Sequence, residues 1–189
     1  FLISLGKPLK GILYLGNKQS INSEYNKLNE CNQKEFDVKI ISNCILASKN
    51  GKHILSIGDS QTKHLKTLLN KIHNDDGFGI YFYGKKGINF PSLIETRSNR
   101  SDNPDRFRKK YKNTLDHFNY YFSKLTSGDI IVLSSRYEVR WGDRPIPKTQ
   151  RNLKFTYYDS SNKILSKDES YKRWKTLFDN IAEKSLSKG

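Results

Sequence analysis

A short apolar run that stops at a glycine and restarts as a helix constrains the fold of this chain more than any other feature. Residues 54–57 read Ile-Leu-Ser-Ile, which has the length and composition of a buried central strand. Gly58-Asp59-Ser60 follows at once, and between residues 65 and 72 apolar side chains return at helical spacing. The pattern predicts a strand that turns directly into a helix, with the Ser60 hydroxyl at the carboxyl edge of a sheet.

This turn is open to two interpretations. A serine at the carboxyl edge of a sheet, beside helix N–H groups that can hold an anion, is well placed to act as a nucleophile. Alternatively, Asp59 or Ser60 only caps the helix, a routine role for both residue types. The local pattern does not decide between them.

The rest of the chain predicts further strands and helices in alternation. Composition favours strands over residues 78–83 and 129–137, and alternation suggests an edge strand over residues 36–41. Apolar residues at three- and four-residue steps predict one helix from Pro104 to near Gly128 and another over residues 171–181. Such alternation is typical of parallel βαβ units, whose sites lie outside the carboxyl ends of the strands. We expect His53, His73 and His117 at the surface.

Composition leaves several partner classes open. The 189 residues fit one domain, and their net charge of +15 favours an anionic partner or reflects a solvated lysine-rich surface. No apolar run approaches the roughly 20 residues of a membrane span. Because the chain begins with Phe1 and lacks methionine, we expect a segment of a longer protein, with any export signal upstream.

Cys31 and Cys44 either form a disulfide bridge that stabilises the fold by about 3 kcal/mol or stay as thiols. No metal-ligand spacing or cofactor motif is present in the sequence.

Three stretches in order resemble one family. Gly58-Asp59-Ser60, with His64-Leu65 shortly after it, resembles the first block of the SGNH (GDSL-like) hydrolases. It is most similar to the SGNH domains of membrane acyltransferases that O-acetylate bacterial surface glycans, although Gln61 stands where those domains typically have histidine. The loop from Gly87 to Pro91 resembles the second block. The strand that ends at Arg136 resembles the strand of these acyltransferase-linked SGNH domains that ends in an Ala-Ala-Arg-Trp-like motif.

The resemblance implies a fold and a set of roles. The fold would be α/β, a three-layer α/β/α SGNH (flavodoxin-like) arrangement with a mainly parallel sheet. Ser60 would be the catalytic nucleophile, and Gly87 would supply an oxyanion N–H. Arg136 would hold the oxyanion or an acidic substrate group. Gly58, Asp59 and His64 would support the motif. Gly87 can instead be an ordinary loop glycine, and Arg136 a salt-bridging residue at the strand end.

The resemblance also implies an organisation and a location. Residues 1–50 would be an N-terminal extension or linker with a Cys31–Cys44 disulfide, and residues 51–189 an SGNH-like domain. The partners would be an acyl donor, a glycan acceptor and a membrane-embedded acyltransferase domain of the same polypeptide, with no nucleic acid. The domain would lie outside the cytoplasm, at the periplasmic face of the inner membrane. In the basic stretch 138–154, Trp141 would stack on a sugar or anchor a surface loop.

One catalytic block of the family has no counterpart in these residues. The family takes its catalytic base from an Asp-x-x-His block near the carboxyl end, and no histidine follows His117. We therefore expect a C-terminally incomplete fold, and this segment alone can lack activity. Three functions stay open: serine-dependent acyl transfer or hydrolysis on a surface glycan such as lipopolysaccharide or peptidoglycan, glycan binding without catalysis, and nucleic-acid binding by a basic α/β domain.

Overall fold

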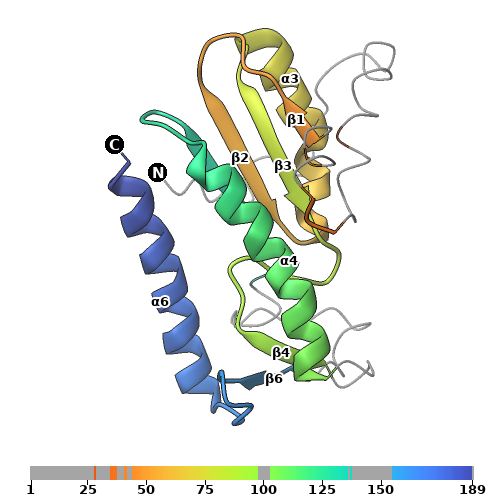
Figure 1. The fold of residues 1–189 in the computed structure, drawn as a ribbon, viewed down its shortest axis with the longest axis vertical. Coiled ribbons are helices and arrows are strands. Elements are labelled where there is room, and N and C mark those ends of the chain that lie inside the picture. Colours follow the sequence, from red (N-terminus) through yellow and green to blue (C-terminus); the bar gives the residue numbers. More distant parts are fainter. Residues whose placement is uncertain are drawn as a thin grey trace, which may run out of the picture.

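A four-stranded sheet forms the centre of the molecule (Figure 1). The computed structural model describes residues 28, 35–37, 41, 44–97, 103–135, 137 and 155–188. The sheet has the order β1-β3-β2-β5, and β2 pairs in parallel with both β3 and β5, whereas β1 runs antiparallel to β3. The predicted α/β class and mainly parallel sheet are thus confirmed, and the finer SGNH assignment stays a prediction. The strands are β1 (Ile45–Leu46), β2 (His53–Gly58), β3 (Gly79–Gly84) and β5 (Ile130–Ser134).

The predicted strand–turn–helix unit is confirmed, with one refinement. After β2, the chain forms a 3₁₀ helix, η3 (Ser60–Leu65), which continues directly into α3 (Lys66–Asp76). Gly77 ends α3 with a φ of 77°, a left-handed conformation that glycine adopts without a steric penalty. The first two turns after the sheet therefore have three residues per turn, which changes which side chains line up with Ser60.

Helices cover both faces of the sheet. Because side chains alternate along a strand, Ile54 and Phe82 face α3, whereas Leu55 and Tyr83 face α4 (Pro104–Ser123). The α3 side is mainly aliphatic. The α4 side is rich in aromatic rings, among them Tyr81, Phe90, Phe118 and Tyr121. The described part of the chain thus forms three layers, helix, sheet and helix.

Three sequence-based expectations are wrong. His117 lies on the sheet side of α4, where it is 3 % exposed and stacks on Tyr83 with ring centroids 3.9 Å apart. Its Nδ1 bonds to the carbonyl of Asn113, and burial lowers its pKa. His73 is also buried, with Nδ1 bonded to the Phe78 carbonyl. Of the edge strand expected over residues 36–41, the structure describes three residues, and none of them is in a strand: residues 36 and 37 have no regular structure and Ile41 is helical.

Two short strands were not expected from the sequence. β4 (Ile94–Arg97) and β6 (Phe155–Tyr158) form a separate antiparallel pair. The chain then enters α6 (Lys167–Leu186), which begins with a capping box between Ser166 and Glu169. Figure 1 shows α6 as an outer helix on the same side of the molecule as α4. None of the helices in the described ranges is both long and apolar enough to cross a membrane.

Some of the first 50 residues belong to the core. Leu28, Ile41, Cys44 and Leu46 are buried, and they pack in the clusters on the two faces of the sheet. Cys44 is disulfide-bonded, whereas Cys31 lies outside the described residues. The boundary at residue 50 stays a prediction, but the residues before it contribute to folding.

Candidate active site at the carboxyl end of the sheet

The order of the strands indicates where a site is expected. The chain leaves the central strand β2, forms β3 on one side of it and then returns to form β5 on the other side. Ligands of open parallel sheets bind outside the carboxyl ends of the strands, at the point where the order reverses. In this molecule that point lies between the residues after β2, which include Asp59 and Ser60, and the residues after β5, which include Ser135.

The ends of β2 and β5 are in close contact. The Asp59 N–H and the Thr62 hydroxyl both donate to the carbonyl of Ser134, over 3.1 and 2.8 Å. A Cβ atom on Gly58 would lie 1.8 Å from that same oxygen and 2.5 Å from Thr62 Oγ1. Packing between the two strands therefore requires glycine at this position, whatever the function of the turn.

The capping role that the sequence left open belongs to Asp59. Its carboxylate accepts a hydrogen bond from the N–H of Gln61 over 2.8 Å, and its side chain is the N-cap of η3. The residue is 4 % exposed. Ser60 is the first residue of η3, and it is half-buried. The serine is thus left in reach of solvent and of a ligand, with the cap supplied by its neighbour.

The loop that contains Gly87 is tied to the same edge. On one side of it, the Lys85 N–H donates to the Gly58 carbonyl over 3.0 Å. On the other side, the Phe90 N–H donates to Ser135 Oγ over 3.2 Å. Gly87 lies between these two points with a φ of 80°, the conformation that favours glycine. The structure therefore brings this loop to the edge at which Ser60 lies.

Ser135 joins these segments; the sequence predicts that residues 134–137 converge on this edge, but it does not indicate a role for Ser135 itself. Its Oγ accepts from the Asp59 N–H over 3.1 Å as well as from the Phe90 N–H. The hydroxyl of Tyr137 also donates to the Phe90 carbonyl. A hydroxyl directly after a strand at the switch point was the available signal for Ser135. Arg136, between these two residues, lies outside the described residues, as does the stretch 138–154 with Trp141.

Asn89 is a second residue that the sequence did not indicate. Its side chain is 1 % exposed, and neither its oxygen nor its nitrogen has a hydrogen-bond partner in the described structure. An unpartnered buried polar group costs about 1–3 kcal/mol. The Gly87 loop therefore contains unused hydrogen-bonding capacity two residues from the glycine.

No histidine in the described ranges lies beside Ser60. His64 is exposed, and the 3₁₀ geometry displaces it by about 120° around the helix axis from Ser60. His53 begins β2, about 17 Å from Gly58 at the usual rise per residue. His73 and His117 are buried against the helices and the sheet. The described part of the chain also contains no group of three or more acidic, His or Cys side chains that could hold a metal ion.

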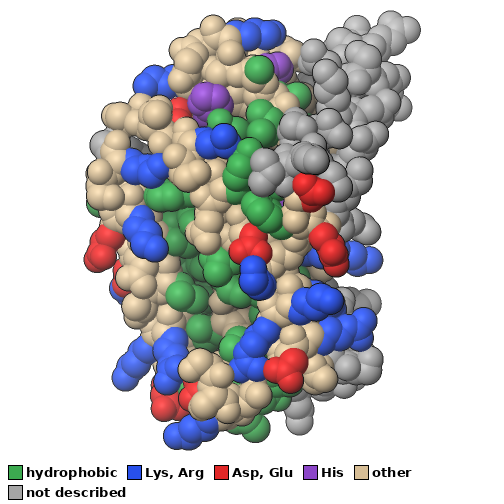
Figure 2. Space-filling view, viewed as in Figure 1, with side chains coloured by type: hydrophobic (Ala, Val, Ile, Leu, Met, Phe, Trp, Pro, Cys, Tyr) green, Lys and Arg blue, Asp and Glu red, His purple; other side chains and the backbone are tan. Residues whose placement is uncertain are grey.

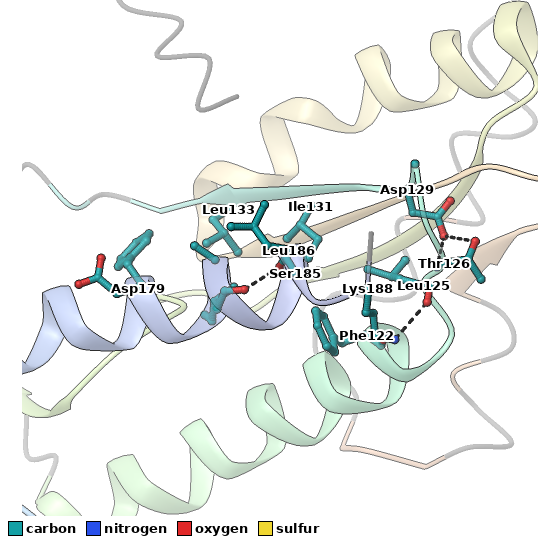
Figure 3. Close-up of a pocket in the computed structure, with 14 residues that line it drawn as sticks. Phe122, Leu125, Thr126, Asp129, Ile131, Leu133, Asp179, Ser185, Leu186 and Lys188 are labelled. Atoms are coloured by element: carbon teal, nitrogen blue, oxygen red, sulfur yellow. Dashed lines mark hydrogen bonds between the residues drawn. The ribbon is translucent and has the colours of Figure 1, made fainter.

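A separate apolar groove lies between α6, β5 and the end of α4 (Figure 3). It has a volume of about 570 Å³, and Phe122, Ile131, Leu133 and Phe178 are among its lining residues. Figure 2 shows apolar side chains along this seam, with Lys and Arg on both sides of it. Ser60 is not in its wall, and the Ser185 hydroxyl in that wall already donates to a helix carbonyl. The groove is therefore distinct from the edge described above.

Comparison with known proteins does not extend this description. The chain matches none of the family models, curated proteins or solved structures with which it was compared. The assignment of chemistry therefore depends on the motif residues and on their places in the fold.

Proposed function

We propose that this chain carries out serine-dependent acyl transfer, with Ser60 as the nucleophile. The observation that carries the proposal is the position of Ser60: half-buried, directly after the buried pair Gly58 and Asp59, at the carboxyl end of the central strand and beside the point where the strand order reverses. The neighbouring Asp59 already caps the helix, so the serine is not needed for that role.

The proposed reaction proceeds in two steps. Ser60 Oγ attacks the carbonyl carbon of an acyl ester, and the tetrahedral intermediate collapses to an acyl-serine as the donor alcohol leaves. A glycan hydroxyl, or water, then attacks the acyl-serine and releases the serine hydroxyl. The N–H groups of Ser60 and Gly87 would stabilise the oxyanion, with Arg136 assisting. Loss of one such donor typically costs about 10²- to 10³-fold in rate.

The substrate class follows from the motif resemblance and the charge. The acyl group would be acetyl, and the acceptor a surface glycan such as lipopolysaccharide or peptidoglycan, at the periplasmic face of the inner membrane. A net charge of +15 supports an anionic acceptor. A membrane-embedded acyltransferase domain of the same polypeptide would deliver the acyl group.

The test is the hydrolysis of p-nitrophenyl acetate by the wild type and by Ser60→Ala. The account predicts turnover by the wild type, and a fall to the uncatalysed background when Ser60 is replaced. Ser127→Ala, at an exposed serine away from this edge, is the matched control and should retain full activity. Turnover that persists in Ser60→Ala, or its absence from the wild type, would reject the proposal.

A second function, glycan binding without catalysis, is favoured by one observation. No histidine of the described ranges lies beside Ser60, so the base used by the resembling family is not in place there. This function predicts that an acidic glycan binds to wild type and Ser60→Ala with equal affinity, and that neither protein releases p-nitrophenol above background.

A further inference from the structure

β5 is less covered by the rest of the molecule than β2 and β3 are. β2 and β3 have nearly all of their side chains buried, whereas each of the five side chains of β5 keeps some exposure. β5 lies at the edge of the sheet, and two side chains of α6 next to it, Phe178 and Ile181, are only half-buried. α6 thus lies beside β5 without closing over it, and the groove of about 570 Å³ is left between them (Figure 3).

The interior of the groove is mainly apolar. Side chains from three parts of the chain line it: Phe122 and Leu125 near the end of α4, Ile131 and Leu133 of β5, and Phe178 and Ile181 of α6. This lining is continuous with the hydrophobic core on the α4 face of the sheet, against which Phe122, Ile131 and Leu133 also pack. Because this apolar surface stays in contact with water, a ligand that covers it with an apolar part is favoured.

Most polar groups in the wall of the groove already have partners within the protein. Figure 3 shows Asp179 toward one end of the groove, and its carboxylate accepts from Lys175 Nζ over 2.9 Å. The Ser185 hydroxyl donates to a helix carbonyl over 2.6 Å. At the other end the Asp129 side chain is 1 % exposed, and its carboxylate accepts three hydrogen bonds, two of them from Thr126. These groups therefore leave little hydrogen-bonding capacity for a polar ligand.

Positive charge is concentrated at the Asp129 end of the groove. Lys188 Nζ donates to two backbone carbonyls over 2.6 and 3.0 Å, which takes two of the three N–H groups of an ammonium. Lys52 Nζ donates to the Ser127 carbonyl over 2.7 Å, beside Gly128 in the wall. In the part of the chain that the structure describes, neither lysine forms a salt bridge. Two ammonium groups thus outweigh one buried carboxylate, so this end complements an anionic group of a ligand.

The size of the groove limits the kind of ligand that fits. The lining residues of α6 extend from Phe178 to Leu186, a length of about 12 Å along the helix. The volume lies within the range of about 300–1,000 Å³ that is usual for small-molecule sites. Two turns of an α-helix, about 10 Å across and 11 Å long, would occupy about 850 Å³. The groove is therefore too small for an amphipathic helix of a partner protein, whereas an extended alkyl chain fits its length and volume.

We propose that this groove binds a fatty acid, with the alkyl chain between α6 and β5 and the carboxylate at Lys188. The apolar lining covers the chain, and the remaining N–H of the Lys188 ammonium donates to the carboxylate. The Asp179 carboxylate disfavours the opposite orientation. Ser60 does not line the groove, so this site goes beyond the proposed acyl transfer and does not require it. The alternative is that Lys188 only caps the carbonyls at the end of α4, and in that case its charge has no effect on binding.

The first experiment measures the binding of octanoate, decanoate and the uncharged decanol to the wild type by isothermal titration calorimetry, at concentrations of monomeric ligand. Each buried methylene should tighten binding about fourfold, so decanoate should bind about 15-fold more tightly than octanoate. Lys188→Gln should bind decanoate at least about tenfold more weakly than the wild type does, because it loses the charge. The same variant should bind decanol with unchanged affinity.

A second pair of variants tests where the chain lies. Ala182 is exposed and lines the groove, so Ala182→Phe fills part of the groove without changing a buried residue. It should weaken decanoate binding at least about tenfold. Asn180→Phe is the matched control, because Asn180 is exposed on the same helix and does not line the groove, and it should bind decanoate as the wild type does. Ser60→Ala should also bind decanoate normally, so failure of this inference and failure of the proposed function are distinguishable.

Several results would overturn the inference. One is a wild type that binds no decanoate, or that binds decanol as tightly as decanoate. Another is undiminished binding of decanoate by folded Ala182→Phe. A wild-type dimer that Ala182→Phe converts to a monomer in sedimentation would mean that a second copy of the chain covers the groove. Binding to phosphatidylglycerol vesicles without binding of monomeric decanoate would assign the surface to a membrane. Should Ala182→Phe not fold, Lys188→Gln decides, since an unchanged affinity of that variant for decanoate contradicts the inference.

Discussion

The two ends of β2 carry different parts of what a serine hydrolase needs. At the carboxyl end Ser60 lies beside Asp59 and the Gly87 loop, with no described histidine next to it. At the amino end His53 Nδ1 lies 3.8 Å from Asp129 Oδ1, a histidine–carboxylate pair with no serine attached to it. The ends are about 17 Å apart along the strand, so the pair cannot serve Ser60.

The polar residues at the two ends of β2 have different roles, because only the carboxyl ends of parallel strands form a binding edge. At the amino end the Asp129 carboxylate accepts from the N–H groups of His53 and Thr126, over 2.7 Å each, and its side chain is 1 % exposed. His53 stacks on Tyr81 with centroids 5.0 Å apart. These contacts join the starts of β2 and β5 and stabilise the fold. The carboxyl end leaves polar groups accessible, as expected of a binding edge.

The largest effect on stability is expected at the carboxyl end, for Gly58→Ala. The new Cβ would meet the Ser134 carbonyl at 1.8 Å, and that backbone atom cannot move without parting β2 from β5. We predict a loss of at least about 3 kcal/mol in the free energy of unfolding, measured by urea denaturation. Gly51→Ala is the control, since its Cβ would meet nothing within 4 Å, although its φ of +78° still disfavours alanine. A Gly58→Ala protein no less stable than Gly51→Ala would contradict this account of the strand contact.

At the amino end, Asp129→Ala should reduce stability and leave activity unchanged. It removes the acceptor of two backbone N–H groups and the partner of His53, which should cost about 2–3 kcal/mol. Urea denaturation measures the cost, and hydrolysis of p-nitrophenyl acetate well below the melting temperature measures the activity. Loss of activity in a folded Asp129→Ala protein would mean that the two ends are not independent.

Between the two ends, Lys66 should produce a pH dependence of stability. The pKa of Lys66 is about 8 in the folded protein and 10.5 in the unfolded chain, so between these two pH values the unfolded chain binds more protons. The sign of the effect is therefore that stability rises with pH between about pH 8 and 10. Above this range the buried Tyr83, whose pKa is raised to about 12, opposes the gain. Lys66→Met should lack the rise in urea denaturation, and an equal rise in that variant would exclude Lys66 as its source.

Much of the fold could be predicted from the sequence. The central strand and the turn into a helix could be predicted, because the apolar run, Gly58 and the helical spacing of the residues that follow all indicate the same local structure. The buried positions of His73 and His117 could not be predicted from the sequence. His117 lies beside the apolar stripe of α4, and two rings distant in the sequence, Tyr83 and Phe36, pack against it. β4 and β6 pair residues about 60 positions apart, a contact that no local pattern encodes.

The candidate site was predictable only in part. Ser60 and Gly87 follow strands and were found by that signal. Ser135 acts through hydrogen bonds to two other segments, and Asn89 is notable only because its amide is buried without a partner. The residues from Ser60 to Leu65 form a 3₁₀ helix in place of an α-helix, a difference in hydrogen bonding that the residue pattern does not reveal.

The measurement that tests the central claim most directly is the detection of an acyl-enzyme. Wild type and Ser60→Ala would be mixed with p-nitrophenyl acetate, quenched in acid and digested, and the peptides analysed by mass spectrometry. The account predicts one acetyl group on Ser60 in the wild type, and none on the corresponding peptide of Ser60→Ala. Acetylation that is confined to lysines or to other serines, or that is absent altogether, would contradict a nucleophilic role for Ser60.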